Sequence, residues 1–346
     1  MIKSNRNLLV AAVVLGALSV FSYADSVSRA DRFESGQKLL PNLDPDAVAG
    51  ILVRSPDGSV TLNRQGERFA VAEAQGYRAR NESVNRLVRG LLDLELDRRV
   101  GSGDQLAGEL GLEPMAEEGF EVALTNATGG EMVKVRFGDQ VEDGQGRFVQ
   151  RLDGEDRTIY RTTGSVLFDL QPADYLDKEI ADVQASEIER IEGPDFVLAR
   201  AEDEGTLELV EPSRPTSSTE VSKLSSFLNR LRFEEVYVAD DPEVAALRFA
   251  PVLRFELDDQ SGFVVYHATD GEDRDFVRIN GFFGVDRIEI DRDTPDEELE
   301  EKSELLKRAD EIDAYNQYHG SWVYQLQDFD AEKLDLRASD LIAESS

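Results

Sequence analysis

The stretch VNRLVRGLLDLEL at residues 84–96 occurs a second time, as VSKLSSFLNRLRF at residues 221–233. The same offset of 137 residues joins the longer segments Val60–Pro114 and Val197–Pro251. The matched positions are Val60, Val84, Leu87, Leu91, Leu94, Leu96, Leu110, Leu112 and Pro114, which return as Val197, Val221, Leu224, Leu228, Leu231, Phe233, Leu247, Phe249 and Pro251. An apolar pattern kept in register over about 50 residues indicates an internal duplication, so the chain is predicted to use one structural unit twice.

The composition of the chain limits its size class and its partners. It has 346 residues, 40% of them hydrophobic, which is enough for two domains with ordinary cores. The absence of cysteine excludes disulfides, thiolate zinc sites and cysteine nucleophiles. The formal net charge of −33, from 71 acidic and 38 basic residues, disfavours nucleic acid and anionic lipid as partners of the folded body. Such a surface is typical of a solubility adaptation, for instance to a salty environment.

The N-terminus carries a membrane signal. Lys3 and Arg6 precede an uncharged apolar run at residues 8–24, which as a helix would be about 25 Å long, close to the thickness of a thin bilayer core. The short segment before this run, residues 1–7, is expected to stay in the cytoplasm because of its two basic residues. The run is either an uncleaved transmembrane anchor or a cleaved signal peptide, since Ser22-Tyr23-Ala24 has small residues at a suitable cleavage position. Both interpretations place the chain from about Asp25 onward outside the cytoplasm, with residues 25–43 as a linker.

Lobe one, residues 44–178, is predicted to hold a mostly antiparallel sheet and one main helix. The helix begins at Asn81, because apolar residues from Val84 to Leu94 follow a period of 3.6. A short helix is expected from Asp104 to about Gly111, and another at residues 164–170 that closes the lobe. Alternating apolar residues and turn sequences predict the strands at residues 48–54, 59–63, 69–72, 96–100, 120–125, 132–137, 147–152 and 158–162.

Lobe two, residues 179–346, repeats this order. Its main helix is expected to start near Thr219 and to carry its apolar stripe as far as Leu231. Strands are predicted at residues 188–191, 196–201, 206–210, 235–239, 252–257, 263–268, 276–279 and 322–324. The predicted fold class is therefore α+β, with two tandem similar lobes, each a mostly antiparallel sheet backed by one main helix, after an N-terminal transmembrane segment.

An acidic insertion near residues 281–320 distinguishes lobe two from lobe one. Thr294-Pro295-Asp296-Glu297 predicts a helix start, with a threonine N-cap, proline in the first turn and acidic residues at the positive end of the dipole. The helix is expected to end near Tyr315. Its apolar stripe either packs on lobe two or meets a partner protein. The candidate partner-binding residues are Leu299, Leu305, Leu306, Ile312 and Tyr315.

The sequence holds no recognised catalytic arrangement or cofactor motif. Phosphate-binding and dinucleotide-binding glycine loops are absent, and neither His267 nor His319 stands in a known catalytic motif. Asp291, Asp293 and Asp296 are weak candidates for a calcium site, because calcium prefers several carboxylates. They lack the glycine and the terminal glutamate of an EF-hand loop. We therefore predict a protein that is not an enzyme and carries no cofactor or structural metal.

Several of these segments together resemble the bacterial family called domain of unknown function 4340. The resemblance covers residues 8–342 and rests on the membrane segment followed by the linker sequence Gly36–Pro41, on the Asp57-Gly58 hairpin, on the helical stretch Tyr77–Leu94 and on Leu110–Pro114. The duplicated lobe supports it. These motifs are structural, so the resemblance transfers no catalytic residue.

The resemblance implies a place in the cell and a class of partner. Members of this family are commonly encoded beside ABC transporters related to the gliding-motility auxiliary systems. The implied protein is a single-pass protein of the bacterial inner membrane, with a cytoplasmic N-terminus and a periplasmic body. It would bind the permease, the ATPase or auxiliary subunits of an export system, or the exported substrate. The alternatives are an extracytoplasmic hydrolase with a site at the lobe junction and a structural spacer of the envelope.

Overall fold

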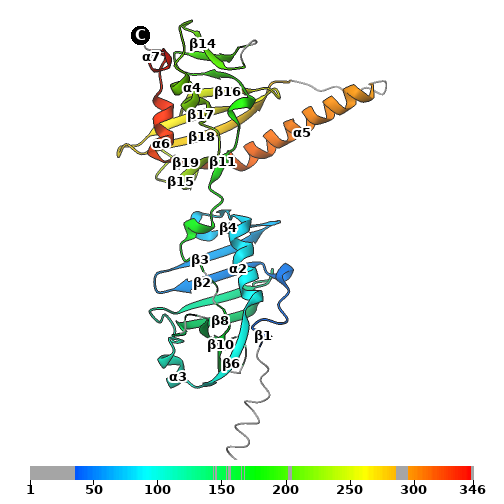
Figure 1. Ribbon diagram of the computed structural model, residues 1–346, viewed down its shortest axis with the longest axis vertical. Coiled ribbons are helices and arrows are strands. Elements are labelled where there is room, and N and C mark those ends of the chain that lie inside the picture. The colour runs from blue at the N-terminus through cyan, green and yellow to red at the C-terminus, as the bar shows by residue number, and fades with distance from the viewer. Residues whose placement is uncertain are drawn as a thin grey trace, which may run out of the picture. The chain divides into compact units, whose positions relative to one another are not determined.

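The computed structural model describes residues 36–343, except residues 143, 145, 153, 155, 156, 165, 167, 202–204 and 286–294. The chain separates into two compact units, one ending at Asp177 and the other starting at Lys178 (Figure 1). They are called lobe one and lobe two below. The expected membrane segment, residues 8–24, lies outside the described residues, and within them no helix is long and apolar enough to cross a membrane.

The described residues of each lobe form one large antiparallel sheet, so the fold is α+β as predicted. The strands of lobe one are β1 (Gln37–Lys38), β2 (Gly50–Ser55), β3 (Gly58–Gln65), β4 (Arg68–Val71), β5 (Tyr77–Arg78), β6 (Glu95–Ser102), β7 (Phe120–Thr125), β8 (Glu131–Gln140), β9 (Arg147–Arg151) and β10 (Thr158–Thr162). The strands of lobe two are β11 (Glu179–Ala181), β12 (Ile188–Glu192), β13 (Val197–Arg200), β14 (Leu207–Glu211), β15 (Leu231–Val238), β16 (Ala250–Leu257), β17 (Ser261–Thr269), β18 (Asp275–Phe283) and β19 (Trp322–Leu326).

The two sheets have the same strand order. In lobe one the order is β1-β6-β10-β9-β8-β7-β2-β3-β4-β5, and in lobe two it is β11-β15-β19-β18-β17-β16-β12-β13-β14. Each strand of lobe two therefore has a counterpart at the same place in lobe one, and among the described strands β5 alone is left over. Because hydrophobic alternation buries one face of each strand, as in β7 where Phe120, Val122 and Leu124 are buried, the repeated pattern produces the repeated sheet.

The main helix has an equivalent place in the two lobes, since α2 precedes β6 and α4 precedes β15. The α-helices are α2 (Asn81–Asp93), α3 (Asp104–Glu109), α4 (Ser218–Ser225), α5 (Asp296–His319), α6 (Asp328–Ala331) and α7 (Ala338–Leu341). The 3₁₀ helices are η1 (Pro45–Ala47), η2 (Ala72–Ala74), η3 (Pro172–Tyr175), η4 (Ala185–Glu187) and η5 (Glu332–Asp335). The main helix of lobe one, α2, crosses one face of its sheet (Figure 1) and buries Val84, Leu87 and Leu91.

The helix of lobe two is shorter than predicted. It ends at Ser225, and Leu231, expected within the helix, is the first residue of β15. Two serines explain the early end: the Ser225 and Ser226 hydroxyls donate to the backbone carbonyls of Ser222 and Lys223, at 3.2 and 2.7 Å. Such local bonds compete with helix propagation. Phe227 and Leu228 nevertheless stay fully buried, so the apolar pattern is kept while the backbone changes.

A small hydrophobic cluster is also repeated between the lobes. In lobe one Ala107, Leu112 and Ile159 pack together with Val100, Leu106, Leu110 and Phe148 around them. In lobe two Val244, Phe276 and Val323 do so, with Tyr237, Leu247 and Phe249 around them. Four of these pairs keep the offset of 137 residues: Val100 and Tyr237, Ala107 and Val244, Leu110 and Leu247, and Leu112 and Phe249.

The offset ends after Leu112 and Phe249. Lobe two enters β16 at Ala250, whereas lobe one needs residues 113–119 to reach β7. The predicted match of Pro114 with Pro251 is therefore wrong: Pro251 lies in β16 opposite Tyr266, and Pro114 lies in a loop that lobe two lacks.

Two further predictions for lobe one are wrong. The described residues of 164–170 are not helical. Tertiary contacts decide their path, because Val166 packs against Gly90 of α2, and the Phe168 ring centroid lies 4.4 Å from that of Phe120. In the expected linker, Gln37–Lys38 pairs with β6 as strand β1, and the two leucines that follow are buried, so lobe one begins before residue 44.

Helix α5 is inserted where lobe one has a short connection. Lobe one joins β9 to β10 through residues 152–157, whereas lobe two joins β18 to β19 through residues 284–321. The helix has 24 residues, ends at His319 instead of near Tyr315, and has Pro295 at its N-cap; Thr294, the predicted cap, lies outside the described residues. Figure 1 shows its first turns extending beyond the sheet of lobe two.

Candidate functional site

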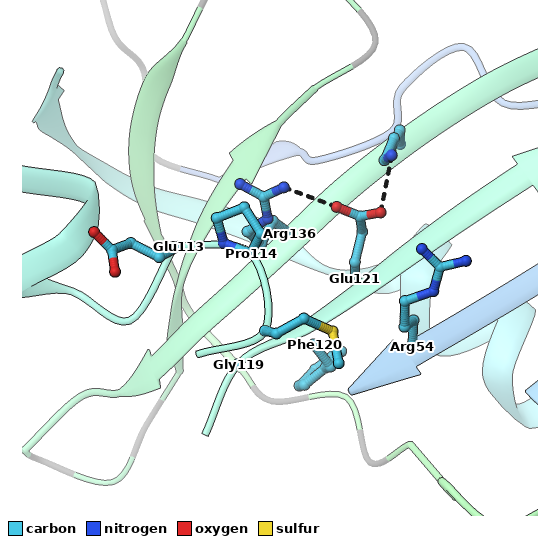
Figure 2. A pocket seen from close by; sticks show the side chains of 9 residues that line it. Arg54, Glu113, Pro114, Gly119, Phe120, Glu121 and Arg136 are labelled. Carbon is cyan, nitrogen blue, oxygen red and sulfur yellow. Dashed lines mark hydrogen bonds and ion pairs between the residues drawn. The ribbon is translucent and has the colours of Figure 1, made fainter. Parts of the chain in front are cut away.

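The loop that only lobe one has, residues 113–119, covers one side of a pocket of about 240 Å³ (Figure 2). The loop follows Leu112, which is held in the small cluster beside α3, and it ends where β7 begins. Strands β2, β7 and β8 supply the other side. The lining residues are Arg54, Glu113, Pro114, Met115, Gly119, Phe120, Glu121, Lys134 and Arg136.

The charges of this pocket are dominated by cations. Glu121 accepts from Lys134 Nζ and from Arg136 Nη2, both at 2.9 Å, and Arg136 also donates to the carbonyl of Leu112 at 3.1 Å. Burial raises the pKa of Glu121, but its hydrogen bonds to the two cations and their charges outweigh burial, so the pKa lies below its ordinary value. Figure 2 shows the carboxylate of Glu113 pointing away from Glu121.

Two arginine side chains of the pocket, those of Arg136 and Arg54, have N–H donors that a ligand could use. The Nε of Arg136 is buried without a hydrogen-bond partner among the described residues. Arg54, the strand partner of Glu121, is exposed. Three cations around one inward carboxylate give the pocket a local positive charge in a strongly negative protein. The arrangement is suited to hold a small anionic group.

Lobe two does not repeat these charges. In lobe one Arg54, Glu121 and Arg136 stand side by side across three strands. The corresponding row of lobe two is Glu192, Arg254 and Val264. The signs of the first two residues are exchanged and the third is apolar, so the basic pocket belongs to lobe one alone.

Lobe two has its own cavity, of about 720 Å³, where α5 rejoins the sheet. It is lined by Phe249, Tyr266, Arg278, Asn280, Gly281, Asn316, His319, Gly320 and Trp322. His319 is buried, and its Nδ1 lies 2.6 Å from the hydroxyl of Tyr324. Its ring stacks on Tyr315 with centroids 4.2 Å apart, so this histidine is held inside an aromatic cluster. The other histidine, His267, binds Asp275, with 2.7 Å between Nε2 and Oδ1.

The predicted partner-binding residues fall into two groups along α5. The first half of the helix, residues 296–307, carries Leu299, Leu305 and Leu306, of which Leu306 is 40% exposed and the others are half-buried. We call this part the free half. The second half, residues 308–319, carries Ile312 and Tyr315 and is called the docked half.

The docked half is held on the sheet by several contacts. Ile312 is buried, and the Tyr315 ring lies edge-on to Phe263 at 5.2 Å between centroids. Arg308 pairs with Asp259 at 2.6 Å. Asn316 acts as an additional strand partner: its Oδ1 accepts from the Gly281 N–H at 2.7 Å, and its Nδ2 donates to the Gly281 carbonyl at 2.8 Å.

The weak metal candidates are not brought into a described site. Asp291 and Asp293 lie outside the described residues, as does the side chain of Asp296. Within the described part of the chain, no group of three or more His, Asp or Glu residues could hold a metal ion.

Sequence reasoning missed both pockets. Their charged residues are far apart in the chain, and arginines of this kind alternate on many strands of an acidic protein. One signal was present: residues 113–119 and 284–321 are among the segments that one lobe has and the other lacks. In a duplicated fold such unmatched segments are natural places for a lobe-specific site.

Comparison with known families identifies the family of this chain. A family model described as Domain of unknown function (DUF4340) matches residues 70–249, just over half of the chain. The match starts in β4 of lobe one and ends at the start of β16 in lobe two, so it spans parts of both lobes and stops before α5. Searches of curated proteins and of solved structures find no match. The chain belongs to the DUF4340 family.

Proposed function

We propose that the protein is a membrane-anchored periplasmic accessory protein of an ABC-type export system, and that it acts by binding a protein partner and not by catalysis. The observation that carries this proposal is the free half of α5. It belongs to an insertion that one of the two similar lobes has and the other lacks, and its first turns extend beyond the sheet (Figure 1). A helix placed in this way is an arm that another protein can bind.

The free half is suited to remain helical before it meets a partner. Its twelve residues span about 18 Å. Glu298 pairs with Lys302 at 3.6 Å, and Lys307 pairs with Glu311 at 3.8 Å, both with helical i,i+4 spacing. Each such pair stabilises a helix by about 0.2–0.5 kcal/mol. The docked half anchors the following turn, so little conformational entropy would be lost on binding.

The leucines give the arm a recognition face. Leu299 and Leu306 are seven residues apart and so lie on one face, whereas Leu305 is turned about 100° from Leu306 and lies in line with Ile312, seven residues further on. An amphipathic helix that inserts leucines at this spacing into a groove is a common mode of protein recognition. The acidic residues around them favour a groove with a basic rim.

The location and the partner come from the N-terminal sequence and from the family. The uncharged run at residues 8–24 favours an anchor that leaves the body outside the cytoplasm. The resemblance to proteins encoded beside gliding-type ABC transporters favours the permease, the ATPase or auxiliary subunits as partners. For a periplasmic arm, the accessible surfaces are those of the permease and of the auxiliary subunits.

Co-purification tests this proposal. The full-length chain is purified in mild detergent from its own host, and subunits of the neighbouring transporter are identified by mass spectrometry. We expect these subunits with the native chain and a strong loss with Leu305→Ser/Leu306→Ser. The matched control, Glu300→Ser/Glu301→Ser, changes two exposed residues of the same half and should keep them. Recovery of no transporter subunit with the native chain would contradict the proposal, and is the result expected of a hydrolase or an envelope spacer.

A further inference from the structure

The cavity of lobe two lies where strands β18 and β19 diverge, and we call this place the fork. Strand β18 pairs with β17 along nine residues, but with β19 only at Phe276 and Val277. Beyond Val277 the strands part, because the chain leaves β18 to form α5 before it returns as β19. In lobe one the corresponding strands are joined by a short turn and pair at three positions. The insertion therefore opens a cavity between these two strands.

The fork has the dimensions of a small-molecule site. Its volume of about 720 Å³ lies within the range of roughly 300–1,000 Å³ found for ligand pockets. One wall is the open edge of β18, and the other is the end of α5 with Gly320 and Trp322. Gly281 lets the helix approach, since a Cβ there would lie 3.1 Å from Ile312. The docked half of α5 thus packs closely on β18 and forms one wall of the cavity.

Arg278 brings an unneutralised positive charge into the fork. Its guanidinium carbon lies over the Phe249 ring, 4.8 Å from the ring centroid, within the range of a cation–π contact. Among the described residues, its Nη2 donates to the carbonyl of Ala239, at 3.5 Å, and its Nε is buried without a hydrogen-bond partner. No acidic residue is among the described residues that line the cavity. In a protein of net charge −33, a half-buried guanidinium that pairs with no carboxylate of the described residues is suited to take an anionic partner from outside.

Aromatic rings surround this cation. Tyr266 is the strand partner of Arg278, and Phe249 and Trp322 line the same cavity. Trp322 is 8% exposed, so its ring is held rigidly by the sheet. Rigid aromatic rings of this kind bind the faces of ligand rings, both aromatic rings and the apolar faces of sugars. The exposed amide of Asn280 adds a hydrogen-bonding group beside them.

We propose that the fork between β18 and β19 binds a small ring-bearing carboxylate, with Arg278 holding the carboxylate and with Phe249, Tyr266 and Trp322 holding the ring. The planar guanidinium matches a carboxylate in two parallel hydrogen bonds, and one of them can use the Nε that is now without an acceptor. Two classes of ligand carry both groups, aromatic acids and acidic sugars. Both have the carboxylate on the ring that stacks.

Calorimetric titration of the purified full chain tests the site. The probes are benzoate and glucuronate, and their uncharged counterparts are benzamide and glucose. We expect at least one carboxylate to bind saturably and its counterpart to bind much more weakly. Binding of benzoate alone identifies an aromatic acid, and binding of glucuronate alone identifies an acidic sugar. Saturable binding of neither carboxylate, or equal binding of the uncharged counterparts, would overturn the proposal.

Three variants locate the binding. Arg278→Gln should weaken it about 10- to 100-fold, as expected for loss of a charge-assisted pair. Tyr266→Leu should weaken it less, through loss of the ring contact. Arg254→Gln is the matched control, because Arg254 also lies over an aromatic ring, that of Phe282, but is paired with Glu256 and is outside the cavity. Unchanged affinity in Arg278→Gln would refute the assignment, and circular dichroism identifies a variant that has not folded.

This inference does not depend on the proposed transporter partner. The titration uses the purified chain alone, and Leu305 and Leu306 do not line the fork. A chain that binds the carboxylate but co-purifies no transporter subunit would contradict only the proposed function. A chain that co-purifies transporter subunits but binds neither carboxylate would contradict only the ligand site.

Discussion

Replacing Asn316 by alanine should release the docked half of α5 from β18. The side chain makes two hydrogen bonds to the backbone of Gly281, at 2.7 and 2.8 Å. Each such bond contributes about 0.5–1.5 kcal/mol, so loss of both lowers the free energy of docking by about 1–3 kcal/mol. The undocked population should therefore rise by about 5- to 150-fold. The contacts of Ile312 and Arg308 remain, so docking is weakened and not abolished.

Hydrogen exchange followed by mass spectrometry measures this release. Peptides from residues 308–319 should exchange faster in Asn316→Ala, while peptides from α2 in lobe one should be unchanged, because local opening is governed by local contacts. Gln317→Ala is the matched control, since Gln317 is the exposed neighbour on the same turn. Equal protection of residues 308–319 in the native chain and in Asn316→Ala would refute the docking argument. Loss of protection throughout lobe two would also refute it, because the bonds would then stabilise the whole sheet.

Three further predictions concern stability, each measured by urea unfolding. Ile312→Ala should cost about 2–4 kcal/mol, since Ile312 is 4% exposed, whereas Leu306→Ser in the free half should stay within about 0.5 kcal/mol; similar costs would contradict the division of α5 into two halves. Gly281→Ala brings a methyl group to about 3.1 Å from Ile312 and should destabilise lobe two. The double variant Gly281→Ala/Ile312→Ala should lose less stability than the sum of the two single variants. Strict additivity would show that the two residues do not touch. Because the pKa of Glu121 is lowered in the fold, its ion pairs stabilise the protein fully above the ordinary value of 4.5 and lose this effect as the pH falls through the lowered value. The difference in unfolding free energy between the native chain and Glu121→Gln should therefore shrink on acidification. A difference that stays constant with pH would contradict the pairing.

The sequence was sufficient to predict the repeat because the repeat lies in the core. Positions such as Leu87 and Leu224 are buried on equivalent helices, and burial is what a hydrophobic period encodes. Strands β7 and β10 have the residues predicted for them, since their alternation is regular and turns flank them. The shared strand order follows from the same repeat.

Other features depended on tertiary contacts that no local pattern encodes. Val166 and Phe168 take their positions from contacts with Gly90 and Phe120, which are distant in the sequence. The fork brings Arg278 to Trp322 only because an insertion separates two strands. The basic pocket joins Arg54 to Arg136 across three strands, and neither arginine is unusual in its own segment.

The central claim, that α5 is a periplasmic arm in contact with an ABC exporter, is tested most directly by crosslinking from a single cysteine in intact spheroplasts. The native chain has no cysteine, so Leu306→Cys and the control Ala127→Cys, on an exposed hairpin of lobe one, each provide one attachment point for a membrane-impermeant maleimide photocrosslinker. The account predicts that both positions react without lysis and that position 306 alone crosslinks to a transporter subunit. Reaction of either position only after lysis, or the absence of a transporter crosslink from position 306, would contradict it.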